Sequence, residues 1–444
     1  MFKAVRNTFL PNRFFLLFGV AAILFSLGFP FPVFYQVGLA FFIVSLALVF
    51  ADVMLLFNRK VKLEVTRRLP KVFSLGDPNP VHVELHNRSS RRLLLALIDE
   101  LPVEFQVRDF EQRARLEPGE KQSIHYDLTP NKRGEYAFGN IHVYLYTSIG
   151  LIQKRVTIPC AAAIPVYPSI IQMKKYALKA FDKVTVLQGI KKIRRIGHSY
   201  EFEQIKELVR GDDYRSINWK ATSRKGGLMV NQYEDERAQQ VYCLIDKSRV
   251  MRLPFHGLSL MDYAINTCLV MSNIALQKHD KAGLLTFSDK IGSIIKADRK
   301  GDQLNKIMTA LYNEKERPLE ANYELAYQAA IRLIKGRSLM LLFTSFESMF
   351  ALERVLPVLR RINLQHLLVV IFFENTEIND LAFREVKDLE GIYTQTMAQK
   401  FVSEKGQMVQ KLRQFGIQAV LTRPEELSVN TINKYLELKA RGLI

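Results

Sequence analysis

The stretch Val241-Tyr242-Cys243-Leu244-Ile245-Asp246 is an apolar run that ends in a carboxylate. An amphipathic stretch at helical spacing follows at residues 260–277, and a second apolar run follows at residues 282–287. Short apolar runs that alternate with amphipathic helices are typical of a largely parallel sheet covered by helices. We therefore predict an α/β domain over residues 237–444.

The same alternation continues towards the C-terminus. The pattern predicts strands at 338–343, 366–373 and 417–421, and helices at 304–311, 323–334, 353–361 and 425–443. Open sheets of this kind bind ligands at the carboxyl ends of their strands, and Asp246 comes directly after the first strand. A metal ion bound by this domain is therefore expected beside Asp246.

The segment just upstream is the most informative part of the sequence. It contains two runs, Arg194-Arg195-Ile196-Gly197-His198-Ser199-Tyr200-Glu201-Phe202-Glu203 and Val209-Arg210-Gly211-Asp212-Asp213-Tyr214-Arg215-Ser216-Ile217-Asn218-Trp219-Lys220-Ala221-Thr222-Ser223-Arg224. Gly211 permits a tight turn, Asp212 and Asp213 can cap the backbone that follows, and Arg215 is close enough to pair with one of them. These residues predict a locked turn.

Trp219 and Lys220, which follow this turn, are expected to lie in opposite environments. Trp219 is the only tryptophan in the chain, and we expect it to anchor the segment in an apolar pocket, with Lys220 on the solvent side. Adjacent carboxylates with Arg and Lys nearby could instead hold a metal or act in acid/base chemistry. Two consecutive Asp residues without a His or a placed nucleophile are a weak catalytic signal, so a structural or docking clamp is favoured.

Residues 59–170 alternate between apolar and polar side chains at the spacing of β-strands. Alternating runs at 61–65, 81–86, 123–128 and 141–146 are separated by turn signals such as Pro118-Gly119 and Asn131-Lys132-Arg133-Gly134. Short strands at this spacing predict a small β-sandwich. The next segment, residues 171–236, holds a basic linker and the two runs quoted above.

Two uncharged stretches near the N-terminus, residues 14–29 and 33–51, predict a transmembrane helical hairpin over residues 1–58. The connector carries no Lys or Arg, whereas basic residues flank both outer ends: Lys3, Arg6 and Arg13 before the hairpin and Arg59, Lys60, Lys62, Arg67 and Arg68 after it. This asymmetry predicts that both ends face the cytoplasm. A cleaved signal peptide is the alternative, but no small-residue cleavage site follows Phe29.

The chain of 444 residues carries 63 Lys plus Arg against 44 Asp plus Glu, a formal charge of +19 that favours anionic partners. Much of the excess lies in residues 174–197. This basic linker could lie against the anionic lipid of the inner leaflet, or it could be a solvated charge run. The three cysteines are widely spaced and indicate neither a disulfide framework nor a zinc site.

The two quoted runs resemble the signature of the domain of unknown function 58 family. The family pattern is roughly Arg-Arg-x-Gly-x-x-x-Glu-Phe followed by Gly-Asp-Asp-x-Arg-x-Ile-Asp-Trp-Lys, and this chain departs from the family at Lys206, Asn218 and Asn231. The resemblance implies a von Willebrand A-like (Rossmann-like) domain and a bacterial inner-membrane protein with its bulk in the cytoplasm. The expected partner-binding residues are Arg194, Arg195, Gly197, Glu201, Phe202, Gly211, Asp212, Asp213, Arg215, Trp219 and Lys220.

Von Willebrand A domains hold magnesium with an Asp-x-Ser-x-Ser loop plus a Thr and an Asp from later loops. Here the loop reads Asp246-Lys247-Ser248-Arg249-Val250, in which Val250 cannot coordinate; Asn322 lies near the expected Thr, and Thr344-Ser345-Phe346-Glu347 lacks the Asp. Positive charge at Lys247 and Arg249 opposes a cation. We predict a degenerate site at Asp246 and Ser248 with no tightly bound metal and no cofactor.

The resemblance further implies an accessory protein that works with a MoxR-type AAA+ ATPase in the assembly or maturation of other proteins. We therefore expect a docking or adaptor protein that is not an enzyme and that contacts membrane lipid. One alternative is a metal-dependent hydrolase that uses Asp212 and Asp213 or Asp246. The other is a nucleic-acid binder that uses the basic linker, which is less favoured because aromatic residues are sparse there.

Overall fold

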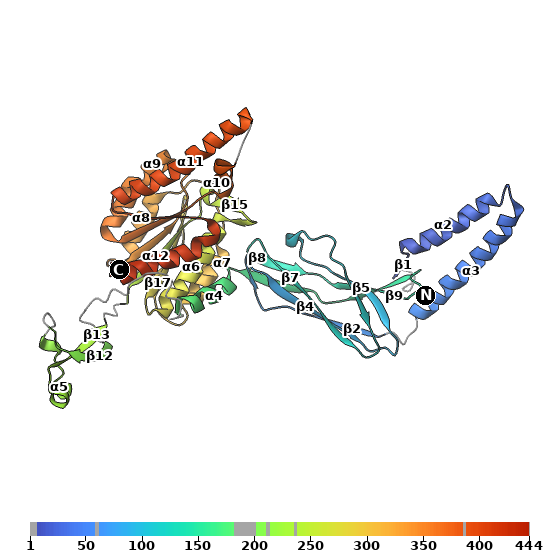
Figure 1. The fold of residues 1–444 in the computed structure, drawn as a ribbon, viewed down its shortest axis with the longest axis horizontal. Helices are drawn as coiled ribbons and strands as arrows, with labels where there is room; N and C mark the ends of the chain where they lie inside the picture. The colour runs from blue at the N-terminus through green and yellow to red at the C-terminus, as the bar shows by residue number, and fades with distance from the viewer. Residues whose placement is uncertain are drawn as a thin grey trace. The chain divides into compact units, whose positions relative to one another are not determined.

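The computed structural model describes residues 7–57, 62–181, 201–209, 214–234, 238–384 and 388–443. The chain divides into two compact units, Met1–Tyr167 and Pro168–Ile444. The first unit contains two apolar helices and a β-rich region, and the second is an α/β domain (Figure 1). The finer division into four segments stays a prediction.

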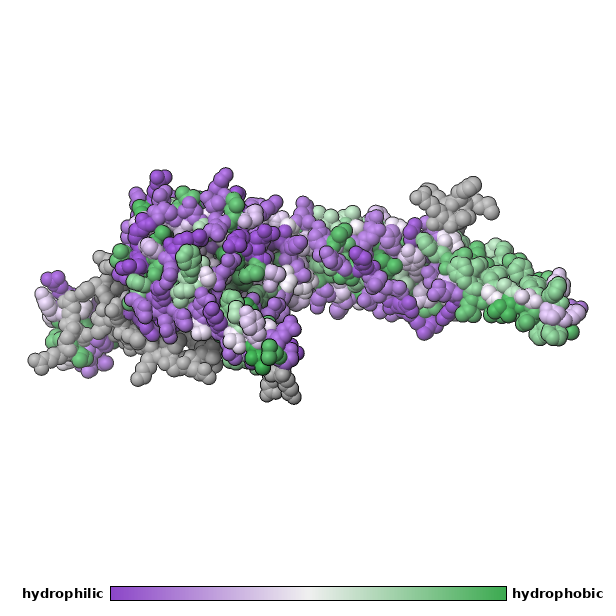
Figure 2. Space-filling model, turned by 90° about the horizontal axis from the view of Figure 1, so that it is seen from above, coloured by the Kyte–Doolittle hydropathy of each residue, from purple (hydrophilic) through white to green (hydrophobic). Residues whose placement is uncertain are grey.

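Two apolar helices, α2 (Asn12–Leu27) and α3 (Pro32–Leu56), lie near the N-terminus. Only α3, among the described residues, is both long and apolar enough to cross a membrane, and α2 is shorter. The two helices pack closely at Gly38, where a Cβ atom would lie 3.3 Å from the Leu24 side chain. Hydrophobic surface is concentrated over these helices (Figure 2), which is consistent with a membrane anchor.

The β-rich region consists of three sheets with the strand orders β1-β10-β9-β5-β6, β2-β4-β7 and β3-β11-β8. Its strands are β1 (Thr8–Phe9), β2 (Leu63–Arg68), β3 (Phe73–Ser74), β4 (Asn79–Asn87), β5 (Leu93–Asp99), β6 (Gln112–Leu116), β7 (Lys121–Leu128), β8 (Gly134–Phe138), β9 (Ile141–Tyr146), β10 (Gln153–Ile158) and β11 (Ala162–Tyr167). Alternate residues of β4, such as Val83 and Leu85, share one buried core with Leu95 and Val143 of the first sheet. The alternation in the sequence therefore produced the predicted strands.

Asp52, near the end of α3, joins this helix to the β-rich region. Its side chain is fully buried, and its carboxylate accepts hydrogen bonds from the backbone N–H groups of Leu151 and Ile152, both at 2.9 Å, and from the Thr147 hydroxyl. The chain that precedes α2 is held to the same region, because β1 pairs antiparallel with β10. Both outer ends of the helical pair are thus attached to one sheet.

The second unit is built on a six-stranded sheet with the order β18-β17-β14-β19-β20-β21. All neighbouring strands are parallel except β17 and β18. The strands are β14 (Gln240–Asp246), β17 (Lys281–Phe287), β18 (Ile291–Asp298), β19 (Leu339–Phe343), β20 (Leu367–Phe373) and β21 (Gln418–Thr422). The predicted α/β organisation is confirmed.

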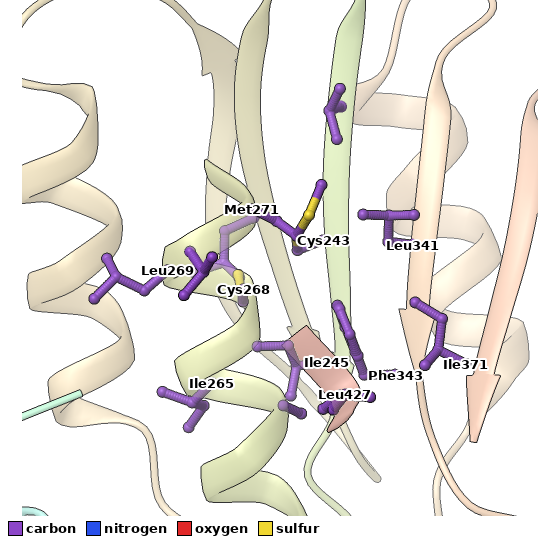
Figure 3. Close-up of a cluster of buried hydrophobic side chains, with 14 of the residues drawn as sticks. Cys243, Ile245, Ile265, Cys268, Leu269, Met271, Leu341, Phe343, Ile371 and Leu427 are labelled. Atoms are coloured by element: carbon purple, nitrogen blue, oxygen red, sulfur yellow. The ribbon is translucent and has the colours of Figure 1, made fainter. Parts of the chain in front are cut away.

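Helices cover both faces of this sheet because its strands are apolar on both sides. Cys243 and Ile245 of β14 lie on the face covered by α6 (Leu260–Gln277) and α12 (Leu427–Ala440) (Figure 3). Tyr242 and Leu244 lie on the opposite face, which is covered by α8 (Tyr323–Leu333), α9 (Met349–Gln365) and α11 (Leu389–Gln414). Two further helices are α7 (Gln303–Asn313) and α10 (Thr376–Phe383).

The remaining elements of this unit are short. They are α4 (Ile170–Phe181), which contacts α6, a small ribbon of β15 (Pro254–Phe255) and β16 (Leu258–Ser259), and the strand–helix–strand segment β12 (Glu201–Glu207), α5 (Trp219–Lys225) and β13 (Met229–Glu234). A capping box starts α6, in which Ser259 and Asp262 satisfy each other's backbone N–H groups. This cap explains why the helix begins where the sequence pattern predicts it.

Candidate functional site

The middle of the signature segment forms an antiparallel ribbon of β12 and β13. Pairing begins between Glu201 and Glu234, which places Glu201 and Phe202 in β12. Between the two strands the chain forms a turn of 3-10 helix at Tyr214–Ser216 and then α5. The predicted site residues that the structure describes here, which are Glu201, Phe202, Arg215, Trp219 and Lys220, therefore belong to one small strand–helix–strand unit.

Asn218 starts α5 and ties it to β13. Its side-chain oxygen accepts a hydrogen bond from Ala221 N at 3.0 Å, which is the usual role of an N-cap Asn, and its Nδ2 donates to Asn231 Oδ1 at 2.7 Å. Two of the three departures from the family pattern therefore contact each other. Both side chains are uncharged amides, so this contact needs no charge.

An aromatic and basic surface lies on the same unit. Trp219 and Tyr214 are both 70 % exposed, and the Arg215 guanidinium lies 5.8 Å from the centre of the Tyr214 ring. Lys220 is exposed, as predicted, and so is Arg224. The expectation that Trp219 fills an apolar pocket is wrong, because two short strands and a seven-residue helix offer too few apolar side chains to cover an indole.

Several other predicted site residues lie outside the described residues. They are Arg194, Arg195, Gly197, Gly211, Asp212 and Asp213. The locked turn and the pairing of Arg215 with an aspartate therefore stay predictions.

Asp246 lies at the carboxyl end of β14, as predicted, and its side chain is fully buried. Its two oxygens accept hydrogen bonds from Ser248 N at 2.9 Å, from the Thr344 hydroxyl at 2.8 Å and from the Tyr323 hydroxyl at 3.2 Å. The two hydroxyl oxygens lie 2.7 Å apart, so one hydroxyl can donate to the other only in place of its bond to Asp246. The carboxylate is thus enclosed by donors of the protein itself.

Burial raises the pKa of Asp246 above its ordinary value, although the hydrogen bonds from Ser248, Thr344 and Tyr323 oppose this shift. Burial and the nearby Asp246 charge also raise the pKa of Tyr323. The Tyr323 hydroxyl therefore stays protonated at neutral pH and remains a hydrogen-bond donor. A small cavity of about 60 Å³ adjoins Asp246 and Ser248.

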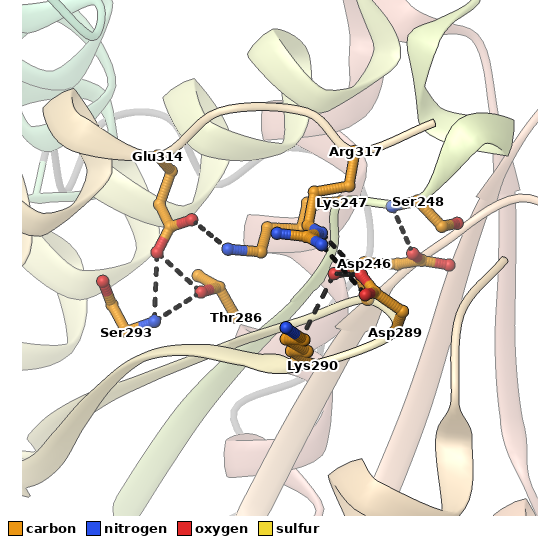
Figure 4. A network of polar contacts seen from close by, with 10 residues as sticks. Asp246, Lys247, Ser248, Thr286, Asp289, Lys290, Ser293, Glu314 and Arg317 are labelled. Atoms are coloured by element: carbon orange, nitrogen blue, oxygen red, sulfur yellow. Dashed lines mark hydrogen bonds and ion pairs between the residues drawn. The ribbon is translucent and has the colours of Figure 1, made fainter. Parts of the chain in front are cut away.

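The charges that flank Asp246 are compensated by other residues. Lys247 Nζ forms a buried ion pair with Glu314 Oε2 at 2.7 Å, and Arg249 pairs with Glu347 at 3.2 Å. Figure 4 shows that Lys247 and Asp246, adjacent in sequence, point to different partners. Lys247 therefore repels a cation at Asp246 less strongly than the sequence suggests. Ser248 is buried beside Asp246.

The sequence did not reveal the two hydroxyls that bind Asp246. Asn322, which lies near the position of the von Willebrand A threonine, instead caps α8 by accepting a hydrogen bond from Leu325 N. The next residue, Tyr323, supplies the hydroxyl. Thr344 could have been found, because it directly follows a predicted strand and therefore lies at the same carboxyl edge of the sheet as Asp246.

Within the described ranges, no group of three or more His, Cys, Asp or Glu side chains is arranged to hold a metal ion. Since we predict no tightly bound ion, about 5 mM magnesium should shift the melting temperature of the purified full-length protein by less than about 1 °C. A tightly bound ion present at 100 times its Kd would instead add about 2.7 kcal/mol to the free energy of unfolding. Differential scanning fluorimetry checks this result. A saturating shift that disappears in Asp246→Asn would contradict the prediction of a degenerate site.

Comparison with known proteins identifies a domain in this chain. Residues 204–397 match the family described as "Protein of unknown function DUF58". "Uncharacterized protein YeaD" of Bacillus subtilis (strain 168) is 26 % identical over 191 residues, which are 41 % of this chain and 48 % of YeaD. The match thus spans about half the length of that relative.

Two solved domains also match part of the chain. A CARDB domain from Pyrococcus furiosus, crystallised with di-metal ions, is 13 % identical, with a TM-score of 0.18, over 24 % of this chain and 90 % of that domain. A PapD-like domain of human CEP192 is 16 % identical, with a TM-score of 0.19, over 25 % of this chain and 89 % of that domain.

Proposed function

With a DUF58 domain over residues 204–397 as the premise, we propose that this protein is a membrane-anchored docking protein and is not itself an enzyme. The observation that carries the proposal is the exposed aromatic and basic surface around Trp219, which includes Tyr214, Arg215 and Lys220. Trp, Tyr and Arg are the side chains that most often dominate the binding energy of protein interfaces. An exposed indole on a small strand–helix–strand unit is suited to bury itself in a partner.

The partner in this proposal is a MoxR-type AAA+ ATPase, the class that the family resemblance implies. The surface around Trp219 carries Arg215, Lys220 and Arg224 and therefore favours an acidic patch on the partner. The ATPase would supply the energy for assembling or maturing other proteins. The role of this chain is to hold the ATPase near the membrane.

Anchoring by two helices is part of the same proposal. The attachment of both outer ends of α2 and α3 to one sheet, through β1 and Asp52, supports placing both ends on the same side of the membrane. The basic flanks favour the cytoplasmic side of a bacterial inner membrane. The sheets that share a core in this unit support a β-sandwich as the neighbouring module.

The sheet order and the position of Asp246 at the end of β14 support a von Willebrand A-like domain. In this proposal the Tyr323 and Thr344 hydroxyls occupy the lone pairs that a metal ion would need. The domain then binds its partner without a metal ion at Asp246.

We expect Trp219→Ala to abolish capture of the ATPase while leaving the protein folded. Because Trp219 is 70 % exposed, the free energy of unfolding should change by no more than about 0.5 kcal/mol. The measurement is affinity capture of the full-length protein from detergent extracts with identification by mass spectrometry, together with a melting curve. Phe350→Ala is the matched control, because Phe350 is an equally exposed aromatic residue (74 %) on α9.

The proposal fails if Trp219→Ala captures the ATPase as well as the wild type does, or if the purified protein turns over a substrate unaided. Basic and aromatic side chains also bind single-stranded nucleic acid. Strong binding of a DNA oligonucleotide that weakens steeply with salt and is lost in Trp219→Ala would favour that alternative.

A further inference from the structure

A second cavity in the Pro168–Ile444 unit lies at the carboxyl ends of β19, β20 and β21 and has a volume of about 670 Å³. This volume falls within the range of about 300–1,000 Å³ that is typical of small-molecule sites. The carboxyl edge of a parallel sheet is also the usual place for ligands. The cavity is separate from the surface around Trp219.

The walls of this cavity are mostly apolar. Phe373 and Leu421 line it from the strand ends, Phe401 and Val402 line it from α11, and Phe255 lines it from β15. Phe401 is 44 % exposed although it lines a concave site. A ligand with an apolar body would therefore remove apolar surface from water.

Several polar groups of the lining already have partners within the protein. Asn375 accepts a hydrogen bond from Ile378 N as the cap of α10, and Glu374 accepts one from Asn379 Nδ2. Glu347 is bound to Arg249. These side chains are therefore already oriented by contacts within the protein.

Lys405 of α11 is different. It lies on the cavity wall, and its ammonium group donates to the Phe346 carbonyl. Glu404, its neighbour in sequence, is directed to Met349 N instead, and no carboxylate in the described parts of the chain forms an ion pair with Lys405. Burial lowers the pKa of Lys405 to about 8, and the charges of Glu404 and Glu347 offset only part of this shift.

We propose that this cavity binds an alkyl carboxylate, with the apolar chain between Phe373, Phe401 and Leu421 and the carboxylate on Lys405 Nζ. An ionised carboxylate supplies the charge-assisted hydrogen bond that the buried ammonium lacks. A peptide fits less well, because each of its backbone N–H and C=O groups needs a partner and much of the polar lining is already occupied.

Binding of octanoate to the full-length protein in lipid nanodiscs tests this proposal. The carboxyl carbon of ¹³C-labelled octanoate reports binding by NMR, and calorimetry gives the affinity. We expect saturable binding to the wild type and at least tenfold weaker binding of octanamide, which has the same chain without the charge. Lys405→Met should weaken octanoate at least tenfold, whereas Lys400→Met, an exposed lysine of the same helix, should not.

A second variant tests the apolar part of the site. Val402→Phe reduces the space beside Lys405 without removing its charge, and we expect it to weaken octanoate as well. Melting curves of all variants show whether each protein is folded. Because Lys405→Met and Val402→Phe perturb the site in unrelated ways, misfolding of one variant leaves the other as a test.

The affinity should also depend on pH. Below about pH 8 the ammonium is charged and pairs with the carboxylate, so octanoate should bind more tightly at pH 7 than at pH 9 in the wild type. Lys405→Met should show no such change. The other charged groups around the ammonium are Glu404 on its own helix and Glu347, Glu374, Asp380, Arg384 and Arg423 on the cavity wall.

Three results would overturn the proposal. They are the absence of saturable octanoate binding to the wild type, equal binding of octanoate and octanamide, and unchanged octanoate binding in Lys405→Met. If an apolar peptide binds at Lys405 more tightly than octanoate does, the ligand of this cavity is a peptide and the proposal of an alkyl carboxylate is wrong.

Discussion

Asp52→Ala is expected to lower the free energy of unfolding of the Met1–Tyr167 unit by about 2–6 kcal/mol. The substitution leaves two buried backbone N–H groups, at Leu151 and Ile152, without an acceptor. Each unsatisfied group of this kind costs about 1–3 kcal/mol. The loop between β9 and β10 should therefore separate from the end of α3.

Hydrogen–deuterium exchange of the full-length protein in detergent measures this effect. We expect the amides of Leu151 and Ile152 to exchange at least tenfold faster in Asp52→Ala, since about 1.4 kcal/mol corresponds to a factor of ten. Asp52→Asn keeps one acceptor oxygen and should give a smaller increase.

Ser45→Ala is the matched control for Asp52→Ala. Ser45 is also a buried polar residue of α3, but its hydroxyl bonds only to the Phe41 carbonyl of the same helix. This variant should leave exchange at Leu151 and Ile152 unchanged. Equal protection of these amides in the wild type and in Asp52→Ala would show that the carboxylate does not hold the loop.

Lys247→Met is expected to cost about 3–5 kcal/mol of stability in the α/β domain, because removing one partner of a buried ion pair leaves the other charge uncompensated. Glu314 retains hydrogen bonds from the Thr286 hydroxyl at 2.7 Å and from Ser293 N at 3.1 Å, so the loss should lie near the lower end of this range. Chemical denaturation of the full-length protein measures it.

This loss should depend on pH. Burial raises the pKa of Glu314, but hydrogen bonds from Lys247, Ser293 and Thr286 outweigh burial and lower the pKa below its ordinary value of 4.5. The stabilisation is therefore fully present above about pH 4.5 and is lost as the pH falls through the lowered pKa of the folded state. The wild type and Lys247→Met should converge in acid.

Lys306→Met is the matched control for Lys247→Met. Lys306 forms an ion pair with Asp302 at 2.7 Å, but both side chains are 57 % exposed. Water and salt already screen this pair, so the denaturation midpoint should stay unchanged. If the Lys247→Met protein is as stable as the Lys306→Met control, the ion pair between Lys247 and Glu314 does not stabilise the α/β domain as predicted.

The parts of the fold that the sequence predicts well are those with a local repeat. The sequence pattern predicts this helix at residues 260–277, and the structure gives α6 as Leu260–Gln277. The sequence pattern does not predict strand β18 or helix α11. β18 is an edge strand with little burial, and α11 leaves apolar side chains such as Leu389 and Tyr393 exposed, so neither shows the periodicity of a half-buried element.

The candidate site shows the same contrast. Asp246 at the end of a strand follows from the order of apolar runs, whereas the exposure of Trp219 does not follow from its residue type. A lone tryptophan is usually largely buried. Its exposure depends on how few apolar side chains the surrounding strand–helix–strand unit can supply.

By itself, the sequence determined the apolar N-terminal segments, the β-rich region and the alternation that builds the parallel sheet, because each of these depends on hydrophobic spacing over a few residues. Only the tertiary structure decided which polar groups meet. Tyr323 and Thr344 reach Asp246 across 77 and 98 residues, and Leu151 reaches Asp52 across 99. Such contacts are set by how sheets, helices and loops pack, and local spacing carries no information about them.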